Sequence, residues 1–161
     1  MTWTPTPGDD QRFLDLAIEQ ASTSWDEGGV PIGAVLVHEG RVLAAGHNQR
    51  VQQESAILHA ETDTIERAGR LPASVYRGSV LYTTLSPCLM CAGTALLYGI
   101  PRVVVGENRS FERSEALLRG RGVAVDILDD ARCLALMERM IAERPETWSE
   151  DIGVESSELS R

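Results

Sequence analysis

The sequence predicts an α/β fold in which a five-stranded mixed sheet carries helices on both faces. Apolar stripes at helical spacing alternate along the chain with short apolar runs that are typical of buried strands. The first two of these runs are joined only by the turn Glu39-Gly40, so they form an antiparallel hairpin. A helix separates each later pair of strands, which favours parallel pairing with the helices packed on the sheet.

The first helix is expected to begin at a cap provided by Asp9 or Asp10 and to end at Gly28-Gly29. Its apolar stripe consists of Leu14, Ala17, Ile18, Ala21 and Trp25. The hairpin strands follow at Ile32 to Val37 and Val42 to His47, and a polar loop, Gln49 to Leu58, leads to the next helix.

The remaining elements alternate in the same way. A helix from His59 to about Ala68 ends at Gly69, and Pro72 and Gly78 bracket a linker. Further strands are expected at Val80 to Thr84, Arg102 to Val105 and Val123 to Leu128. Further helices are expected at Cys88 to Tyr98, at Ser114 to Arg119, from Asp129 or Asp130 to about Glu143, and in a short element from Pro145 to Ile152.

Length and composition indicate one globular domain, which we expect over residues 1–153, followed by a disordered polar tail over residues 154–161. The formal net charge of −9 argues against a nucleic-acid partner, because such binding depends on clustered Lys and Arg. The polar, proline-rich start lacks the pattern of a signal peptide, and no apolar run has the length needed to span a bilayer. We therefore expect a cytoplasmic protein with no membrane partner.

Two short segments have the residue types and spacing of a catalytic zinc site, His59-Ala60-Glu61 and Ser86-Pro87-Cys88-Leu89-Met90-Cys91. Pro87 stands just ahead of an expected helix, so Cys88 and Cys91 lie on one face of its first turn. Free backbone N–H groups and partial positive charge at a helix N-terminus favour the thiolate form, which binds metal. His59 opens its own helix and can converge on the same metal if the metal lies over the open helix end.

One imidazole and two thiolates give three protein ligands, the number typical of catalytic zinc, whereas structural zinc has four. No fourth ligand has a suitable spacing, since Cys133 lies in a distant expected helix and His38 and His47 lie on strands. The alternatives are half of a structural zinc finger or a redox Cys-x-x-Cys pair. A redox pair leaves His59 and Glu61 without a role.

Glu61 is therefore free to act as a base rather than as a ligand. Zinc lowers the pKa of a water molecule to roughly 7. A nearby carboxylate can take the proton from that water and deliver it to a ring nitrogen and a leaving amine.

With these residues in view, the chain resembles fungal-type cytosine deaminases of the cytidine deaminase superfamily, whose zinc signature is His-x-Glu followed by Pro-Cys-x-x-Cys. The likeness runs from about Trp25 to Gly153. It is carried by Glu27-Gly28-Gly29-Val30-Pro31-Ile32-Gly33, Gly46-His47-Asn48, Leu81 to Cys88, Tyr98 to Arg102, Val105-Gly106-Glu107-Asn108, Glu143-Arg144-Pro145, Trp148 and Glu150-Asp151-Ile152-Gly153. The zinc pattern alone is shared with tRNA adenosine, guanine and cytidine deaminases.

The resemblance implies a three-layer αβα sandwich, a homodimer, a bound Zn²⁺ and hydrolytic removal of ammonia from a free pyrimidine base. Cytosine, converted to uracil in pyrimidine salvage, is the implied substrate. His59, Cys88 and Cys91 match the zinc ligands of the family, and Glu61 matches its proton shuttle.

The resemblance also implies the residues that hold the base. Asn48 matches the partner of the ring carbonyl edge, and Asp151 matches the carboxylate that receives the amino group. The walls and remaining contacts match Ile32, Phe111, Trp148, Ala60 and Ser86. These types suit a flat ring, whose faces pack against apolar side chains and whose edges need fixed polar partners.

Two departures from the family bear on the substrate. The fungal enzymes have an aromatic residue three positions after the Asn, where this chain has Val51, and we expect the loss of that wall to enlarge the pocket. The chain also continues past Gly153, close to the segment expected to cover the base. Isocytosine, another small cyclic amidine or a substituted cytosine is therefore an alternative preferred substrate.

Two other functions compete with a free-base deaminase. A tRNA adenosine deaminase needs a basic groove, and the acidic net charge and the Trp148 to Asp151 segment argue against one. A non-catalytic binding protein with this fold would be expected to lack the proton shuttle, and Glu61 is present.

Overall fold

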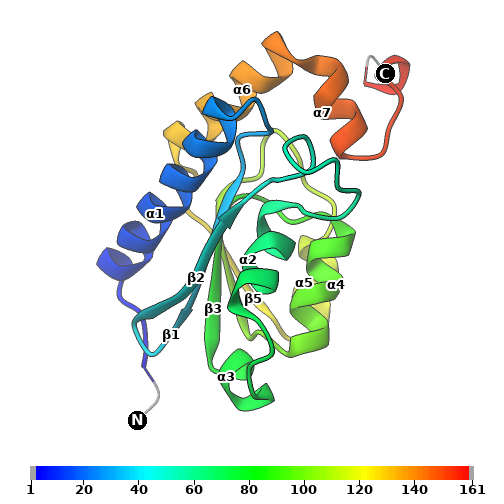
Figure 1. The fold of residues 1–161 in the computed structure, drawn as a ribbon. Helices are drawn as coiled ribbons and strands as arrows, with labels where there is room; N and C mark the ends of the chain where they lie inside the picture. The colour runs from blue at the N-terminus through cyan, green and yellow to red at the C-terminus, as the bar shows by residue number, and fades with distance from the viewer. Residues whose placement is uncertain (1–2, 160–161) are drawn as a thin grey trace.

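The structure is a computed structural model that describes residues 3–159 (Figure 1). Its elements, in chain order, are α1 (Pro7–Asp26), β1 (Gly33–His38), β2 (Arg41–His47), α2 (Ala60–Ala68), α3 (Ala73–Arg77), β3 (Ser79–Leu85), α4 (Leu89–Tyr98), β4 (Arg102–Glu107), α5 (Glu115–Gly120), β5 (Ala124–Ile127), α6 (Ala131–Glu143), α7 (Pro145–Asp151) and the 3₁₀ helix η1 (Ser156–Glu158).

The five strands form one mixed sheet in the order β2-β1-β3-β4-β5. Strand β1 pairs antiparallel with both β2 and β3, while β3, β4 and β5 are parallel. Helices α1 and α6 cover one face of the sheet, and α2, α4 and α5 cover the other (Figure 1). The predicted mixed sheet and three-layer αβα sandwich are thereby confirmed. Two apolar clusters form the core, one mainly under α2, α4 and α5 and the other mainly under α1.

Helix α1 begins earlier than predicted, at Pro7, and its cap is Thr6 rather than Asp9 or Asp10. Asp9 instead completes a capping box from the third helical position, where its carboxylate accepts from the Thr6 backbone N–H at 3.0 Å. The expected cap was wrong because Pro7, with no N–H to satisfy, suits the first helical position.

The segment expected to be a linker contains the short helix α3. Its Tyr76 is buried, stacks on Tyr98 with ring centroids 4.7 Å apart and donates to the Gly69 carbonyl at 2.6 Å. These contacts with α4 and with the end of α2 hold a turn of helix that is too short to be recognised by periodicity.

The predicted disordered tail is ordered over its described part, residues 154–159. The Val154 N–H donates to the Ser149 carbonyl at 2.9 Å, and the hydroxyls of Ser149 and Ser156 lie 3.1 Å apart. The expectation for residues 160–161 lies outside the described residues. Among residues 3–159, no helix has both the length and the apolar character required to cross a membrane.

The strand directions bring several predicted site residues to one edge of the sheet. Asn48, Ser86 and Phe111 follow the carboxyl ends of β2, β3 and β4. Ile32 precedes β1, which is antiparallel to β3 and therefore starts at that same edge. Ligand sites of α/β sheets collect at the carboxyl ends of strands, so the topology alone points to this edge.

Candidate active site

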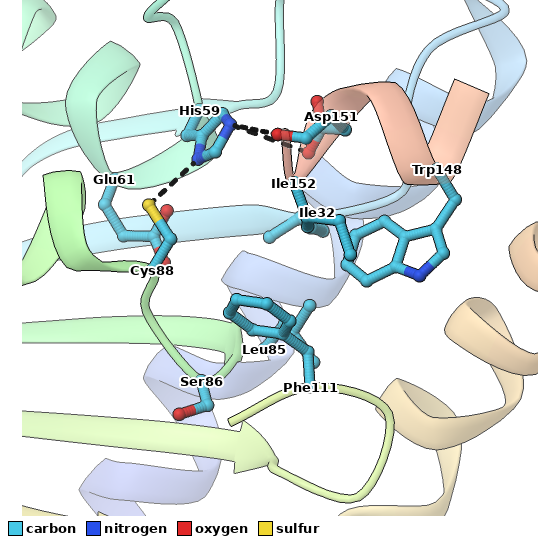
Figure 2. A pocket seen from close by; sticks show the side chains of 10 residues that line it. All are labelled: Ile32, His59, Glu61, Leu85, Ser86, Cys88, Phe111, Trp148, Asp151 and Ile152. Carbon is cyan, nitrogen blue, oxygen red and sulfur yellow. Dashed lines mark hydrogen bonds and ion pairs between the residues drawn. The ribbon is translucent and has the colours of Figure 1, made fainter. Parts of the chain in front are cut away.

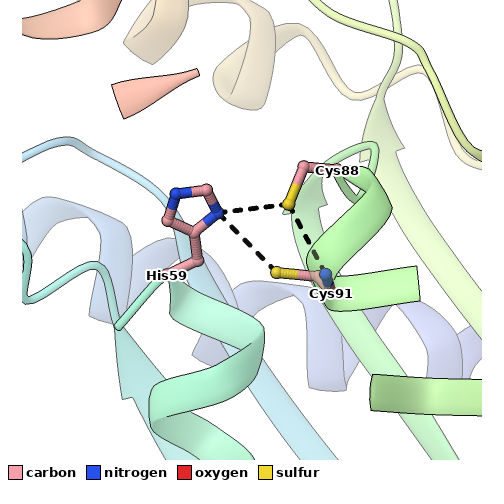
Figure 3. Close-up of side chains that lie close together, drawn as sticks. All are labelled: His59, Cys88 and Cys91. Carbon is pink, nitrogen blue, oxygen red and sulfur yellow. Dashed lines mark hydrogen bonds between the residues drawn. The ribbon is translucent and has the colours of Figure 1, made fainter. Parts of the chain in front are cut away.

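Three predicted zinc ligands meet between two helix N-termini. His59 precedes α2 and Cys88 precedes α4, each as the N-cap residue, and Cys91 lies in the first turn of α4. The His59 Nδ1 atom is 3.4 Å from Cys88 Sγ and 3.7 Å from Cys91 Sγ (Figure 3). All three ligand atoms lie within 4.8 Å of one another, and within residues 3–159 no other group of three or more metal-ligating side chains does so.

The imidazole of His59 is oriented by its second nitrogen. Nε2 lies 3.1 Å from the Asp151 carbonyl oxygen and 3.6 Å from the Asp151 carboxylate (Figure 2). A carbonyl can only accept, so Nε2 carries hydrogen and Nδ1 faces the two sulfur atoms. Orientation of a ligating histidine by such a bond is the usual arrangement at protein metal sites.

The electrostatics favour a thiolate at Cys88. A hydrogen bond from Cys91 lowers the pKa of Cys88 to about 4 against the opposing effect of burial. The same bond and burial raise the pKa of Cys91 well above its ordinary value. Burial lowers the pKa of His59, but the bond to Cys88 and the charge of Asp151 outweigh it and raise the pKa to about 9. Metal binding must displace the protons on His59 and Cys91.

The donor set fits zinc. Two sulfur atoms and one imidazole nitrogen suit this borderline-soft ion, and three protein ligands are typical of catalytic zinc. Glu61, in the first turn of α2, lies on the cavity beside His59 and Cys88.

Glu61 is 4 % exposed, and its Oε1 accepts a hydrogen bond from Thr83 Oγ1 at 2.9 Å. Burial raises the pKa of Glu61, and the charge of Cys88 adds to this effect. A carboxyl group with a raised pKa is well matched to proton transfer near neutral pH.

A small cavity opens beside these residues (Figure 2). It encloses about 280 Å³ of space, solvent at its mouth included, and its apolar walls are Ile32, Leu85, Phe111, Trp148 and Ile152. The rings of Phe111 and Trp148 meet edge to face with centroids 5.9 Å apart. Apolar and aromatic walls with a few polar groups are typical of a site for a small ligand.

Asp151 lines the cavity, and Asn48 lies directly behind it. Asn48 is fully buried and donates from Nδ2 to Asp151 Oδ1 at 2.9 Å. Burial raises the pKa of Asp151. Arg50 Nη1 lies 3.4 Å from the same Oδ1, and its guanidinium pairs with Glu150 at 2.8 Å.

Three predicted base contacts, Asn48, Ala60 and Ser86, lie differently in the structure. Asn48 does not line the cavity, because its amide binds the Asp151 carboxylate and the Arg50 backbone N–H. Ala60 is buried but does not line the cavity. Ser86 lines it, yet its hydroxyl points away from the other side chains in Figure 2 and donates to Glu115 Oε1 at 2.9 Å. Val51 is 42 % exposed and does not line the cavity, so it supplies no wall there, and the expected enlargement of the pocket stays a prediction.

Sequence reasoning missed Leu85, Ile152, Arg50 and Glu115. Leu85 and Ile152 adjoin residues that were predicted, so extending each motif by one residue would have found them. Arg50 and Glu115 act through contacts with residues far along the chain, and no local pattern marks them.

Comparison with known proteins defines the class of this fold and site. The chain matches the family model for the cytidine and deoxycytidylate deaminase zinc-binding region over residues 7–107. It therefore belongs to the cytidine and deoxycytidylate deaminase family and is a zinc-dependent deaminase. Cytosine deaminase of Candida albicans is 50 % identical over 146 residues, which cover 90 % of this chain and 97 % of that protein.

More distant relatives include the tRNA-specific adenosine deaminase of Bacillus subtilis, which is 41 % identical over 98 residues, 60 % of this chain and 61 % of the relative. A solved tRNA:A34 deaminase matches with a TM-score of 0.62 and 31 % identity over 73 % of this chain and 97 % of its own. Guanine deaminase from Nitrosomonas europaea shares the fold, with a TM-score of 0.64 over 88 % of this chain and 87 % of its own.

Proposed function

We propose that this protein hydrolyses the free base cytosine to uracil and ammonia. The observation that carries the proposal is the small cavity that α7 closes directly beside the His59, Cys88 and Cys91 cluster. The 50 % identity to a cytosine deaminase over nearly the whole of both chains supports the same substrate.

The proposed chemistry rests on the chain's own groups around the metal. Zinc held by His59, Cys88 and Cys91 would act as a Lewis acid and lower the pKa of a water molecule to roughly 7. Glu61 takes one proton from the attacking water and delivers it to the ring nitrogen of the base, and it then carries the second proton of that water to the amine, which leaves as ammonia. The hydrogen bond from Thr83 fixes one Glu61 oxygen, so the carboxylate is held in place while it transfers the proton.

The remaining cavity residues hold the base. Asp151 receives the exocyclic amino group, and Asn48 supports Asp151 from behind through the bond from its Nδ2. Ile32, Phe111 and Trp148 pack against the ring faces and exclude water, which strengthens the polar contacts inside. Such positioning of the base accounts for a substantial part of catalysis.

The cavity favours a free base over a nucleoside or tRNA. A ribose attached to the ring nitrogen would have to pass Trp148 and Ile152 on the closing segment. Glycosylation also removes an N–H donor, and a buried acceptor left without a partner costs roughly 1–3 kcal/mol. The acidic charge of the chain speaks against tRNA. Two arginines line the space outside the cavity: Arg50 is paired with Glu150, and Arg113 lies over the Phe111 ring.

A comparison of kcat/KM for cytosine, isocytosine and cytidine, with ammonia release as the readout, tests this function. We expect cytosine to be the best substrate and cytidine to be at least about fivefold worse, because its missing N–H leaves a buried acceptor without a partner. Equal values for cytidine and cytosine would overturn the free-base proposal. A preference for isocytosine would keep the reaction and change the substrate.

A homodimer in the cytoplasm is the proposed state of the protein. Helix α4 leaves Leu89, Leu97 and Tyr98 exposed, with Leu97 at 76 %, and the neighbouring α5 adds the exposed Leu117. These apolar side chains suit burial against a second copy. Light scattering at micromolar concentration should report a dimer, and Leu97→Glu should shift it towards monomer. A monomeric wild-type protein would contradict the proposal.

A further inference from the structure

The turn that carries the zinc ligand Cys88 is held from outside by the start of α5. Ser114 and Glu115 are both buried there, at 0 % and 6 % exposure. The Ser114 hydroxyl donates to the Pro87 carbonyl, and Glu115 Oε1 accepts from the Ser86 hydroxyl at 2.9 Å. The turn also donates its Ser86 N–H to the Glu107 carbonyl at 3.0 Å. Side chains and backbone together thus fix the residues just before Cys88.

Glu115 binds a second segment as well, the loop that carries Phe111. Asn108 Nδ2 donates to both carboxylate oxygens of Glu115, at 3.1 and 3.3 Å. Glu107 folds the same loop, because its Oε2 accepts the backbone N–H groups of Arg109 and Ser110 at 2.7 and 3.0 Å. Phe111, the next residue, is the cavity wall that meets Trp148.

One buried carboxylate therefore links the metal-ligand turn to the cavity wall. We propose that Glu115 is a positioning residue that holds the Ser86 turn and the Phe111 loop as one unit. Through Ser86 it sets the geometry of Cys88 and hence the zinc affinity, and through Asn108 it sets the wall against the base. The second effect rests on the proposed function, whereas the first does not.

A simpler role for Glu115 is helix stability, since it also pairs with Arg119 four residues on at 3.3 Å. That pair is solvent-exposed on the arginine side and contributes about 0–1 kcal/mol. It does not account for two further bonds to segments outside the helix, formed by a carboxylate that is buried. A stability role predicts lower thermal stability alone, with no change in the bound metal.

Single substitutions separate the two links. Ser86→Ala should weaken zinc binding and leave KM for cytosine nearly unchanged, and Asn108→Ala should raise KM and leave zinc binding unchanged. Glu115→Ala should both weaken zinc binding and raise KM for cytosine. Glu115→Gln keeps an acceptor for Ser86 and should retain most of the zinc affinity. Outer partners of metal ligands typically affect affinity by about 10–100-fold, and we expect the lower end for Glu115→Ala because it acts through Ser86.

Zinc affinity is measured on the purified full chain by competition with a chromophoric chelator, without any substrate. The Co²⁺-substituted protein gives a second readout, because its absorption bands report the geometry of the thiolate ligands. The matched control is Glu112→Ala, which removes an exposed carboxylate that bonds only the Glu115 backbone N–H at 2.9 Å. This control should lower the melting temperature without changing zinc affinity or the Co²⁺ spectrum.

The outcomes are distinct. Weaker zinc binding and a changed Co²⁺ spectrum in Glu115→Ala, shared with Ser86→Ala and absent from Glu112→Ala, support the proposal. If Glu115→Ala does not fold, Ser86→Ala and Asn108→Ala still decide it. Wild-type zinc affinity in Ser86→Ala together with wild-type KM in Asn108→Ala would overturn it. The zinc measurement needs no substrate. An error in the proposed substrate would therefore not affect the conclusion that Glu115 positions the Ser86 turn.

Discussion

The two halves of the active site are held in place by different means. The metal half consists of His59, Cys88 and Cys91 at the N-termini of α2 and α4, which pack directly on one face of the sheet. The closing half consists of α7, which carries Trp148 and Asp151 and lies beyond the end of the sheet (Figure 1). The first is positioned mainly by the helices that carry it, together with the bonds from the start of α5, and the second by side chains that come from distant parts of the chain.

The contacts of α7 illustrate this difference. At its start, the Arg144 guanidinium stacks 3.8 Å from the centre of the Trp25 ring and donates to the Gly29 carbonyl at 3.1 Å. At its end, Arg50 pairs with Glu150, and the Asp151 carbonyl accepts from His59. Contacts of this kind are individually worth about 1 kcal/mol. We therefore expect the closing half, rather than the metal half, to move when substrate enters and product leaves.

The largest expected effect belongs to the metal half. Glu61→Gln should reduce kcat by about 10²- to 10⁴-fold, because the amide keeps the shape of the side chain but cannot transfer protons. Metal analysis should still find one zinc per chain, and the melting temperature should stay close to that of the wild type. Activity above a tenth of the wild-type value would show that another group moves the proton.

The closing half should respond differently to substitution. Asp151→Ala removes the proposed acceptor of the amino group and should lower kcat/KM for cytosine by about 10- to 100-fold, as expected for a hydrogen bond to a charged group. Zinc should remain bound, because His59 bonds the Asp151 backbone carbonyl, which the substitution keeps.

The matched control for Asp151→Ala is Glu150→Ala. Glu150 is the neighbouring carboxylate, is 63 % exposed and pairs with Arg50. An exposed ion pair contributes little, so the variant should stay within about threefold of the wild type. Loss of zinc from Asp151→Ala would mean that the two halves are not separately held.

The same contrast explains what could be predicted from sequence. The metal half was predicted as a set because its residues fall in two short motifs at helix N-termini, where spacing and secondary structure determine which side chains converge. The resulting prediction of a zinc-dependent deaminase is confirmed by the family match. The mixed sheet followed from one hairpin and the alternation of the later elements, and it too is confirmed.

The closing half could be anticipated only from the family resemblance. Asp151 and Trp148 have no local pattern that marks a site, and their assigned roles stay predictions. Arg50 and Glu115 were missed because their partners lie across the fold: Arg50 pairs with a residue 100 positions away, and Glu115 with one 29 positions away. The effect of Val51 on the pocket also stays a prediction, since its distance from Asn48 in sequence does not fix the direction of its side chain.

The smallest expected effect concerns acid stability at a position outside both halves. Asp130 caps α6, accepts from the Arg132 backbone N–H at 2.8 Å and pairs with the Arg132 guanidinium at 2.8 Å. This hydrogen bonding with Arg132 lowers the pKa of Asp130 to about 2. A carboxylate whose pKa is lower in the folded state stabilises that state above its ordinary pKa, near 4, and loses this contribution as the pH falls towards 2.

Asp130→Asn isolates the charge, because Asn caps a helix nearly as well as Asp. With Arg132 half exposed, the screened contribution is about 1 kcal/mol, or roughly 2–4 °C in melting temperature for a domain of this size. The difference from the wild type should be full at pH 6 and should shrink steadily below pH 4. Because Arg144 anchors α7 independently of the α6 cap, kcat/KM at pH 7 should not change. A loss of activity comparable to that of Asp151→Ala would show instead that the closing half depends on α6 for its position.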